Sequence, residues 1–186
     1  ISEDQTFGFE NWVGGRYSMW GPVGVCIALS IGSEHFKAFL AGARVVDQHV
    51  RQTSLAENVP VLLALLGHWN QNALGFRSHA VLPYAEDLGR LPAYLQQADM
   101  ESNGKFVGRD GKPVSWNTGA VVWGEPGTNS QHAFFQLLHQ GTEIHPVDFV
   151  AFKTPTSEHE GMHRMLLANA LAQAEALLQG RRAPEG

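Results

Sequence analysis

The second half of the chain alternates three apolar segments of strand length with three helical segments, and this pattern constrains the fold most. The strand-like segments carry too few polar residues to leave one face in water, which is typical of parallel sheets. A helix between successive strands is also the connection that parallel pairing needs. We therefore predict an α/β domain with a mainly parallel sheet covered by helices on both faces, with strands over 78–84, 119–123 and 145–152 and helices over 86–101, 128–140 and 160–179.

Three parallel strands leave two unpaired sheet edges, so further strands are expected to cover them. One source is residues 105–114, where Gly108-Arg109-Asp110-Gly111 contains the Asp-Gly turn signal between apolar flanks and predicts a β-hairpin. The other source is sequence outside this chain. A chain that starts on Ile1 and stops on Gly186 is expected to be an excerpt of a longer protein.

The first part of the chain has no strand signal and predicts helices only. Residues 19–52 predict short helices separated at Gly32 and Gly42, and Asn58 is a good cap for the helix at 61–72. Two apolar runs, Val23–Ile31 and Val59–Trp69, are shorter than the roughly 20 residues of a membrane span and predict core helices. Cys26 lies in the first run and is predicted to be a buried, unreactive side chain.

Composition excludes several classes of function. At 186 residues with 44% hydrophobic content, the chain suffices for a globular core. The net charge of −5, with lysines and arginines scattered singly, gives no footprint for nucleic acid or an anionic membrane. The single cysteine cannot form an intrachain disulfide, which fits a reducing compartment and predicts a cytoplasmic protein.

Acid, amide and imidazole side chains gather between residues 96 and 140. Gln97 and Glu101 are four residues apart, so on a helix they share one face, and Asn103-Gly104 is a pair that often ends a helix. His132 is predicted one turn inside the helix that follows the glycine-rich turn at 124–127. Ligands of open α/β sheets bind where strands end and helices begin, so this stretch is the candidate site.

Three long motifs, in order, resemble the glucose-6-phosphate isomerase family. They are Trp12-Val13-Gly14-Gly15-Arg16-Tyr17-Ser18, Gln96-Gln97-Ala98-Asp99-Met100-Glu101-Ser102-Asn103-Gly104-Lys105 and Val122-Trp123-Gly124-Glu125-Pro126-Gly127-Thr128-Asn129-Ser130-Gln131-His132-Ala133-Phe134. Shorter similarities extend the resemblance over nearly the whole chain, at Asp47-Gln48-His49, Pro60–Gly67, His139-Gln140-Gly141-Thr142 and Leu166-Leu167-Ala168-Asn169. Ser130 departs from the glycine that many members carry there.

The resemblance implies a three-layer α/β/α sugar-isomerase (SIS) domain within a protein roughly three times as long. Residues 1–54 would form an inter-domain helical segment carrying the Gly14-Gly15-Arg16-Tyr17-Ser18 motif. Residues 55–186 would form the second SIS domain, incomplete at its C-terminus. The implied protein is a cytoplasmic homodimer of glycolysis and gluconeogenesis that acts on glucose 6-phosphate and fructose 6-phosphate without a cofactor or metal.

The resemblance also implies a role for each site residue. Glu101 would be the base that moves a proton between C1 and C2 of the sugar, and Arg16 would stabilise the enediolate. His132 would open the sugar ring, a role that suits an imidazole because it titrates near neutrality. Gln97 and Gly15 would contact the substrate.

Other interpretations of these residues remain open at the level of sequence. Taken singly, Glu101 and Arg16 would more often be solvated surface charges, and His132 a structural histidine. A non-catalytic sugar-phosphate-binding SIS module is the alternative function. The segment His159-Glu160-Gly161-Met162-His163 also matches a zinc-hydrolase pattern, but Gly161 weakens the helix that would present both imidazoles, and we predict no metal there.

Overall fold

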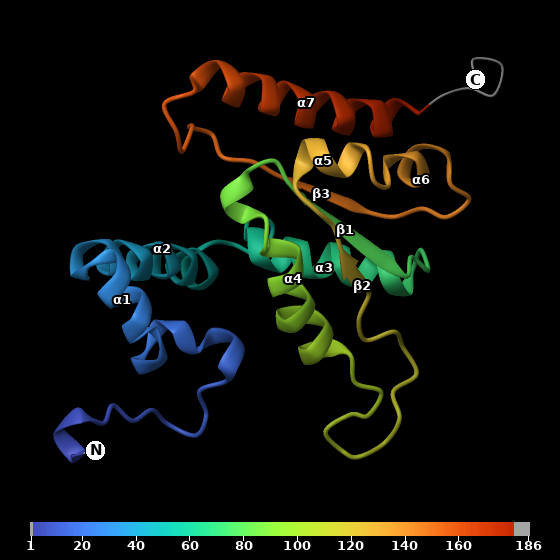
Figure 1. Cartoon of the computed structure of the whole chain (residues 1–186). Helices are drawn as coiled ribbons and strands as arrows, with labels where there is room; N and C mark the ends of the chain where they lie inside the picture. Colours follow the sequence, from blue (N-terminus) through green and yellow to red (C-terminus); the bar gives the residue numbers. More distant parts are fainter. Residues whose placement is uncertain (1, 181–186) are drawn as a thin grey trace. The chain divides into compact units, whose positions relative to one another are not determined.

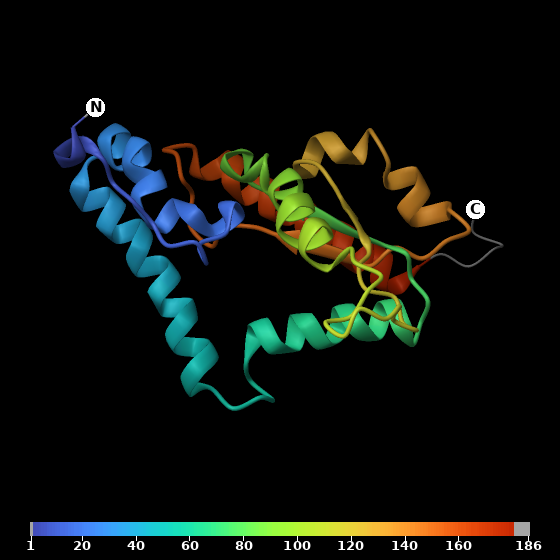
Figure 2. The same cartoon turned by 90° about the horizontal axis from the view of Figure 1, so that it is seen from below.

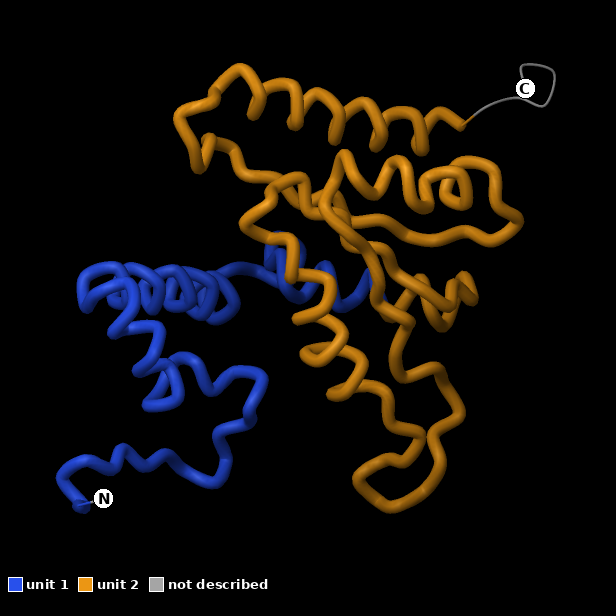
Figure 3. The backbone as a smooth tube through the Cα atoms, in the orientation of Figure 1, with its two compact units in different colours: residues 1–67 blue, residues 68–186 orange. Residues whose placement is uncertain are grey.

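The computed structural model describes residues 2–180 of the chain. The chain divides into two compact units, residues 1–67 and 68–186 (Figure 3). Each unit has its own internal packing and is described separately below.

Unit 1 is helical, as predicted. It contains the short 3-10 helices η1 (Glu3–Gln5), η2 (Gly15–Trp20) and η3 (Pro22–Gly24), then α1 (Val25–Ile31), α2 (Ser33–Gln52) and the start of α3 (Val59–Asn72). The predicted break at Gly32 is confirmed, since its φ of +83° suits glycine. The predicted break at Gly42 is wrong, because α2 runs through it. A helix tolerates an interior glycine at a cost of only about 1 kcal/mol.

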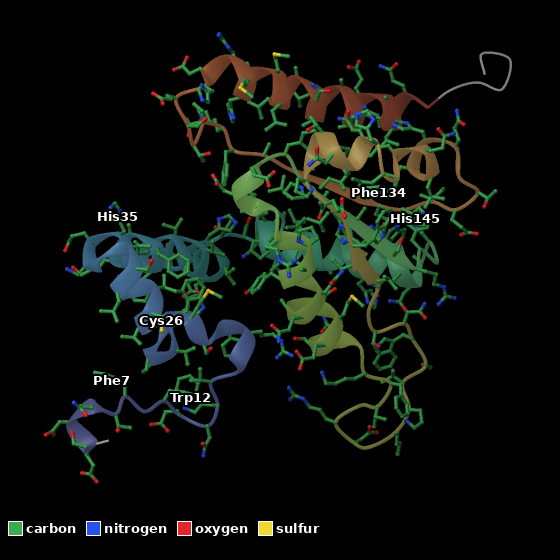
Figure 4. All side chains as sticks on the ribbon, viewed as in Figure 1. Phe7, Trp12, Cys26, His35, Phe134 and His145 are labelled. Atoms are coloured by element: carbon green, nitrogen blue, oxygen red, sulfur yellow. The ribbon has the colours of Figure 1, made fainter. Side chains whose placement is uncertain are left out.

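The prediction that α1 and α3 are core helices is wrong for this chain. Neither helix contains a buried residue, and the α3 side chains of Leu63, Leu65 and Trp69 are all more than half exposed. Cys26, predicted as buried, is exposed (Figure 4). Within unit 1, α1 contacts α2 and η3. None of the helices in residues 2–180 has the length and apolar character that crossing a membrane requires.

The strands of the described residues form one parallel sheet in unit 2, in the order β2-β1-β3. The central strand is β1 (Ser78–Pro83), flanked by β2 (Val121–Trp123) and β3 (Val147–Val150). The predicted parallel sheet is confirmed, although β2 and β3 are shorter than expected. β1 is apolar on both faces because both are covered: Ala80, Val81 and Leu82 are each at most 4% exposed.

Helices lie on both sides of this sheet, as predicted. On one side α5 (Gly127–Gln131), α6 (Phe135–Gln140) and α7 (Glu160–Gln179) cover a core of Leu82, Tyr84, Phe135 and Ala170 (Figure 1). On the other side α4 (Leu91–Leu95) contacts β1 and β2. Figure 2, viewed from below, has α4 in front of the sheet and α7 behind it. The fold is therefore the α/β architecture that the strand and helix alternation predicts.

The predicted hairpin at 105–114 forms only its turn. Val107 and Pro113 make an isolated antiparallel bridge, closed by hydrogen bonds from Gly108 N to Lys112 O (2.8 Å) and from Val114 N to Phe106 O (2.9 Å). Pro113 has no N–H to continue the ladder, which limits strand pairing here. The hairpin does not join the sheet.

Candidate active site

The helix predicted over 86–101 is interrupted, and its last part is π-helical. η4 (Glu86–Leu88) is followed by α4, and a π-helix, η5 (Gln96–Glu101), continues into helical residues as far as Asn103. π-helical turns are rare and occur often at functional sites. Gln97 and Glu101, the two site residues predicted in this segment, both lie in the π-helical turn and are both exposed to solvent.

Several side chains fix this π-helical segment. Gln96 Nε2 donates a hydrogen bond to Val122 O (3.1 Å), and Val122 N donates to Met100 Sδ (3.4 Å). At its C-terminal end, Lys105 Nζ donates to the carbonyl oxygens of Glu101 (2.7 Å) and Ser102 (2.5 Å). A cation at this position satisfies carbonyl groups that the end of a helix leaves without partners. The backbone that carries Glu101 is therefore held at both ends.

The turn between β2 and α5 requires glycine at both of its ends. Gly124 has a φ of +148°, and a Cβ there would lie 1.9 Å from Val81 O. A Cβ on Gly127 would lie 2.4 Å from the Tyr84 ring. These close approaches bring the end of β2 and the start of α5 directly against β1. The glycines in this motif thus set the position of the segment that leads to His132.

His132 does not lie inside a continuous helix, as the sequence predicts, but at a break between two helices. α5 ends at Gln131, His132 caps it, and α6 begins at Phe135. Phe134 packs edge-on against Trp123 (4.7 Å between ring centroids) and stacks on Phe135 (6.0 Å), which is buried in the core. Figure 4 labels Phe134 beside the end of α5. The imidazole of His132 is exposed at this break.

Buried hydrogen bonds hold α5 immediately before His132. Ser130 is 0% exposed, and its hydroxyl donates to Gly127 O (2.6 Å). A serine is therefore accommodated here without an unsatisfied polar group. Gln131 Nε2 donates to the Tyr84 hydroxyl (2.9 Å). Burial raises the pKa of Tyr84, an effect that this hydrogen bond opposes.

Arg16 and Gly15 lie in unit 1, at the start of η2. Their motif folds on itself: Ser18 Oγ donates to Gly15 O (2.8 Å), and Tyr17 OH donates to Trp12 O (3.2 Å). A Cβ on Gly14 would lie 2.7 Å from the Tyr17 ring, so this glycine allows a close approach within the motif. Arg16 is half-buried. The structure brings Gln97 and Glu101 into one turn and places His132 in the same unit.

A histidine–aspartate pair that the sequence analysis did not single out links two strands. His79 Nε2 on β1 lies 2.9 Å from Asp148 Oδ2 on β3, on the face of the sheet that bears Val81. This hydrogen bond raises the pKa of His79, burial opposes it, and the negative charges of Asp148 and Asp99 add to the increase. The two residues are far apart in sequence, and no local pattern marks them as partners.

We expect this pair to make stability depend on pH. Because the folded-state pKa of His79 is raised above the ordinary 6.5, its contribution is complete below about pH 6.5 and is lost as pH rises through the folded-state value. The thermal unfolding midpoint should therefore fall as the pH rises above about 6.5, and His79→Gln should flatten that fall. His35→Gln, at an exposed position on α2, is the control. An unchanged pH dependence in His79→Gln would contradict the assignment.

His159 and His163, the histidines of the zinc-like pattern, both line a cavity of about 440 Å³ near the start of α7. Met162 and Leu166 also line it. Within residues 2–180 there is no group of three or more histidine, cysteine or acidic side chains placed to hold a metal ion. A zinc site normally takes at least three protein ligands. Among the described residues, His159 and His163 have no third such ligand beside them.

Comparison with known proteins identifies relatives over nearly the whole chain. Residues 1–185 match the family model described as phosphoglucose isomerase. The chain is 55% identical over 181 residues to a glucose-6-phosphate isomerase of Methylocella silvestris, covering 97% of this chain and 33% of the relative. The Brucella ovis glucose-6-phosphate isomerase is likewise 55% identical, over 184 residues. The chain thus spans about a third of the length of the curated relatives it matches.

Solved structures agree with the sequence comparison. A crystal structure of a glucose-6-phosphate isomerase from Chlamydia trachomatis superposes with a TM-score of 0.88 at 43% identity, covering 95% of this chain and 35% of that one. A hypothetical protein from Thermus thermophilus superposes with a TM-score of 0.68 at 29% identity, covering 92% of this chain and 43% of that one. Because the family model matches almost every residue and the fold agrees with that of a solved relative, this chain belongs to the phosphoglucose isomerase family.

Proposed function

We propose that this chain is part of an enzyme that interconverts glucose 6-phosphate and fructose 6-phosphate through a cis-enediolate. The observation that carries the proposal is the family match over residues 1–185, which includes all three long motifs. In this proposal residues 1–54 are an inter-domain segment and residues 55–186 an incomplete second SIS domain. The enzyme is a cytoplasmic homodimer that needs no cofactor.

The central chemical step is proton transfer by Glu101. The carboxylate removes the proton from C2 of the open-chain sugar and returns it to C1 on the same face, while the hydroxyl proton on O2 passes to O1, which interconverts aldose and ketose. An exposed carboxylate on a backbone that is held at both ends supports this role, because it is reachable yet fixed. Gln97, in the same π-helical turn, contacts a substrate hydroxyl.

Charge stabilisation and ring opening fall to the remaining residues. The guanidinium of Arg16 supplies the positive charge that stabilises the enediolate oxygen, while Gly15 allows close approach of the backbone. His132 transfers a proton at the ring oxygen to open the cyclic sugar. Its place at the break between α5 and α6 supports this role, because a chain break exposes the imidazole.

Comparing this chain with the full-length protein that contains it tests the proposal. The full-length protein should isomerise fructose 6-phosphate in a coupled assay, and the 186-residue chain alone should show no measurable turnover. Binding of the remote phosphate normally supports catalysis at the reacting carbons, and the residues for it are expected outside this chain. An inactive full-length protein would refute the isomerase function, and an active 186-residue chain would refute the dependence on the rest of the protein.

A further inference from the structure

We propose that Gln96 and Met100 are positioning residues for the proposed site: by binding both outward-facing backbone groups of Val122, they fix the π-helical turn that presents Gln97 and Glu101. This inference rests on the proposed function for the role of Glu101. The contacts themselves are independent of it. They join a helix to a sheet edge through two side chains spaced four residues apart.

The backbone of Val122 faces away from the sheet. Among residues 2–180, β2 is an edge strand that pairs with β1 on one side. Val121 N donates to Arg77 O (3.0 Å), which turns the polar groups of Val121 toward β1. Groups of successive residues alternate in direction along a strand, so the N–H and C=O of Val122 point outward from the edge. An open edge of this kind needs partners.

Gln96 and Met100 supply the pair of groups that a further strand would have supplied. The Gln96 amide donates to Val122 O, and the Met100 sulfur accepts from Val122 N. Val122 is buried, at 4% exposure, so an unmet hydrogen bond there would be costly. The two contacts tie one turn of the helix to one residue of the strand. The helix cannot slide or rotate without breaking one of them.

Each anchoring residue directly precedes a site residue. Gln96 is followed by Gln97, and Met100 is followed by Glu101. Successive side chains of a helix leave the backbone at a fixed angle to each other, so fixing the direction of one side chain fixes the direction of the next. Gln96 and Met100 both lie in the π-helical turn, and residues four apart share one side of a helix, so both can meet Val122. Gln96 and Met100 are therefore four residues apart on one face of the turn, and Gln97 and Glu101 are four residues apart on the adjacent face.

The test is to remove one contact at a time in the full-length enzyme. Met100→Leu keeps the volume and loses the acceptor, and Gln96→Met keeps the length and loses the donor. We expect kcat to fall between about tenfold and a hundredfold with KM nearly unchanged, because a misplaced base weakens chemistry more than binding. Met100→Gln, which restores an acceptor, should recover most of kcat. Met165→Leu, at an exposed position on α7, is the matched control.

A second measurement tests the contact between Val122 and Met100 independently of enzyme activity. Hydrogen exchange at the peptide that contains Val122 should speed up in Met100→Leu and stay unchanged in Met165→Leu. If the wild-type enzyme isomerises its substrate and both contact variants keep wild-type kcat, the positioning role is wrong. It is also wrong if exchange at Val122 is unchanged, or if kcat and KM change together. An inactive wild-type enzyme would instead refute the proposed function. The exchange result would still show whether Met100 contacts Val122.

Discussion

Glu101→Gln in the full-length protein is expected to lower kcat by about 10³- to 10⁴-fold while substrate binding changes little. The amide has the size of the carboxylate but almost no basicity, so it cannot take the C2 proton. The phosphate and hydroxyl contacts of the substrate do not depend on that basicity, and KM should stay within a few-fold of wild type. Exchange of the C2 proton with solvent, followed by NMR in deuterated buffer, measures the step directly.

The control for this variant is Glu143→Gln, which makes the same chemical change at an exposed position outside the π-helical turn. It should leave both the turnover and the exchange rate unchanged. Near-normal exchange in Glu101→Gln, with the protein folded, would exclude the carboxylate as the base. Another residue would then have to be the base, and Met100 would have no catalytic carboxylate to position.

The central sheet was predictable because several features of its sequence, all close together in the chain, indicate a strand. β1 is apolar at every buried position, and glycine and proline mark the ends of the neighbouring segments. Such a segment has few alternatives to a strand with both faces covered. The α7 helix was equally predictable, since its 20 residues match the predicted range of 160–179. In long elements with consistent patterns, tertiary contacts rarely change the secondary structure that the sequence predicts.

Details of the candidate site depend on contacts that no local pattern contains. The π-helical turn forms where Gln96 and Met100 meet Val122, which lies 26 and 22 residues further along the chain. The break at His132 lies beside Phe134, which packs against Trp123 and Phe135. In both places the sequence pattern predicted a regular helix. Motif resemblance identified the residues as candidates without indicating the backbone that presents them.

The exposed apolar helices show a different limit of sequence reasoning. The two apolar runs predict that the side chains of α1 and α3 are buried, but an apolar run does not show which surface covers them. In this chain they remain largely exposed. The chain spans about a third of the length of its relatives, so a residue pattern shaped by a larger protein need not be satisfied within it. Burial was therefore less predictable than secondary structure.

The proposed homodimer makes a prediction about which subunit supplies His132. The family resemblance implies that this histidine serves the Glu101 of the partner subunit. Mixing Glu101→Ala and His132→Ala subunits, after dissociation and reassembly, would then produce heterodimers with one doubly altered site and one intact site. Random pairing of equal amounts makes about half of the dimers mixed, so activity should recover to roughly a quarter of wild type. Each variant alone should remain nearly inactive.

The alternative is a site built from one subunit, and it predicts a different result. Every site in every mixed dimer would then keep one altered residue, so reassembly would restore no activity. If activity is not restored, either the site belongs to one subunit or no heterodimers formed. Native mass spectrometry decides between these two explanations, because it shows whether heterodimers are present. Mixing Glu101→Ala with Glu101→Gln is the matched control, since both variants lack the same group and no pairing can produce an intact site. Confirmed heterodimers without activity would therefore assign His132 and Glu101 to the same subunit.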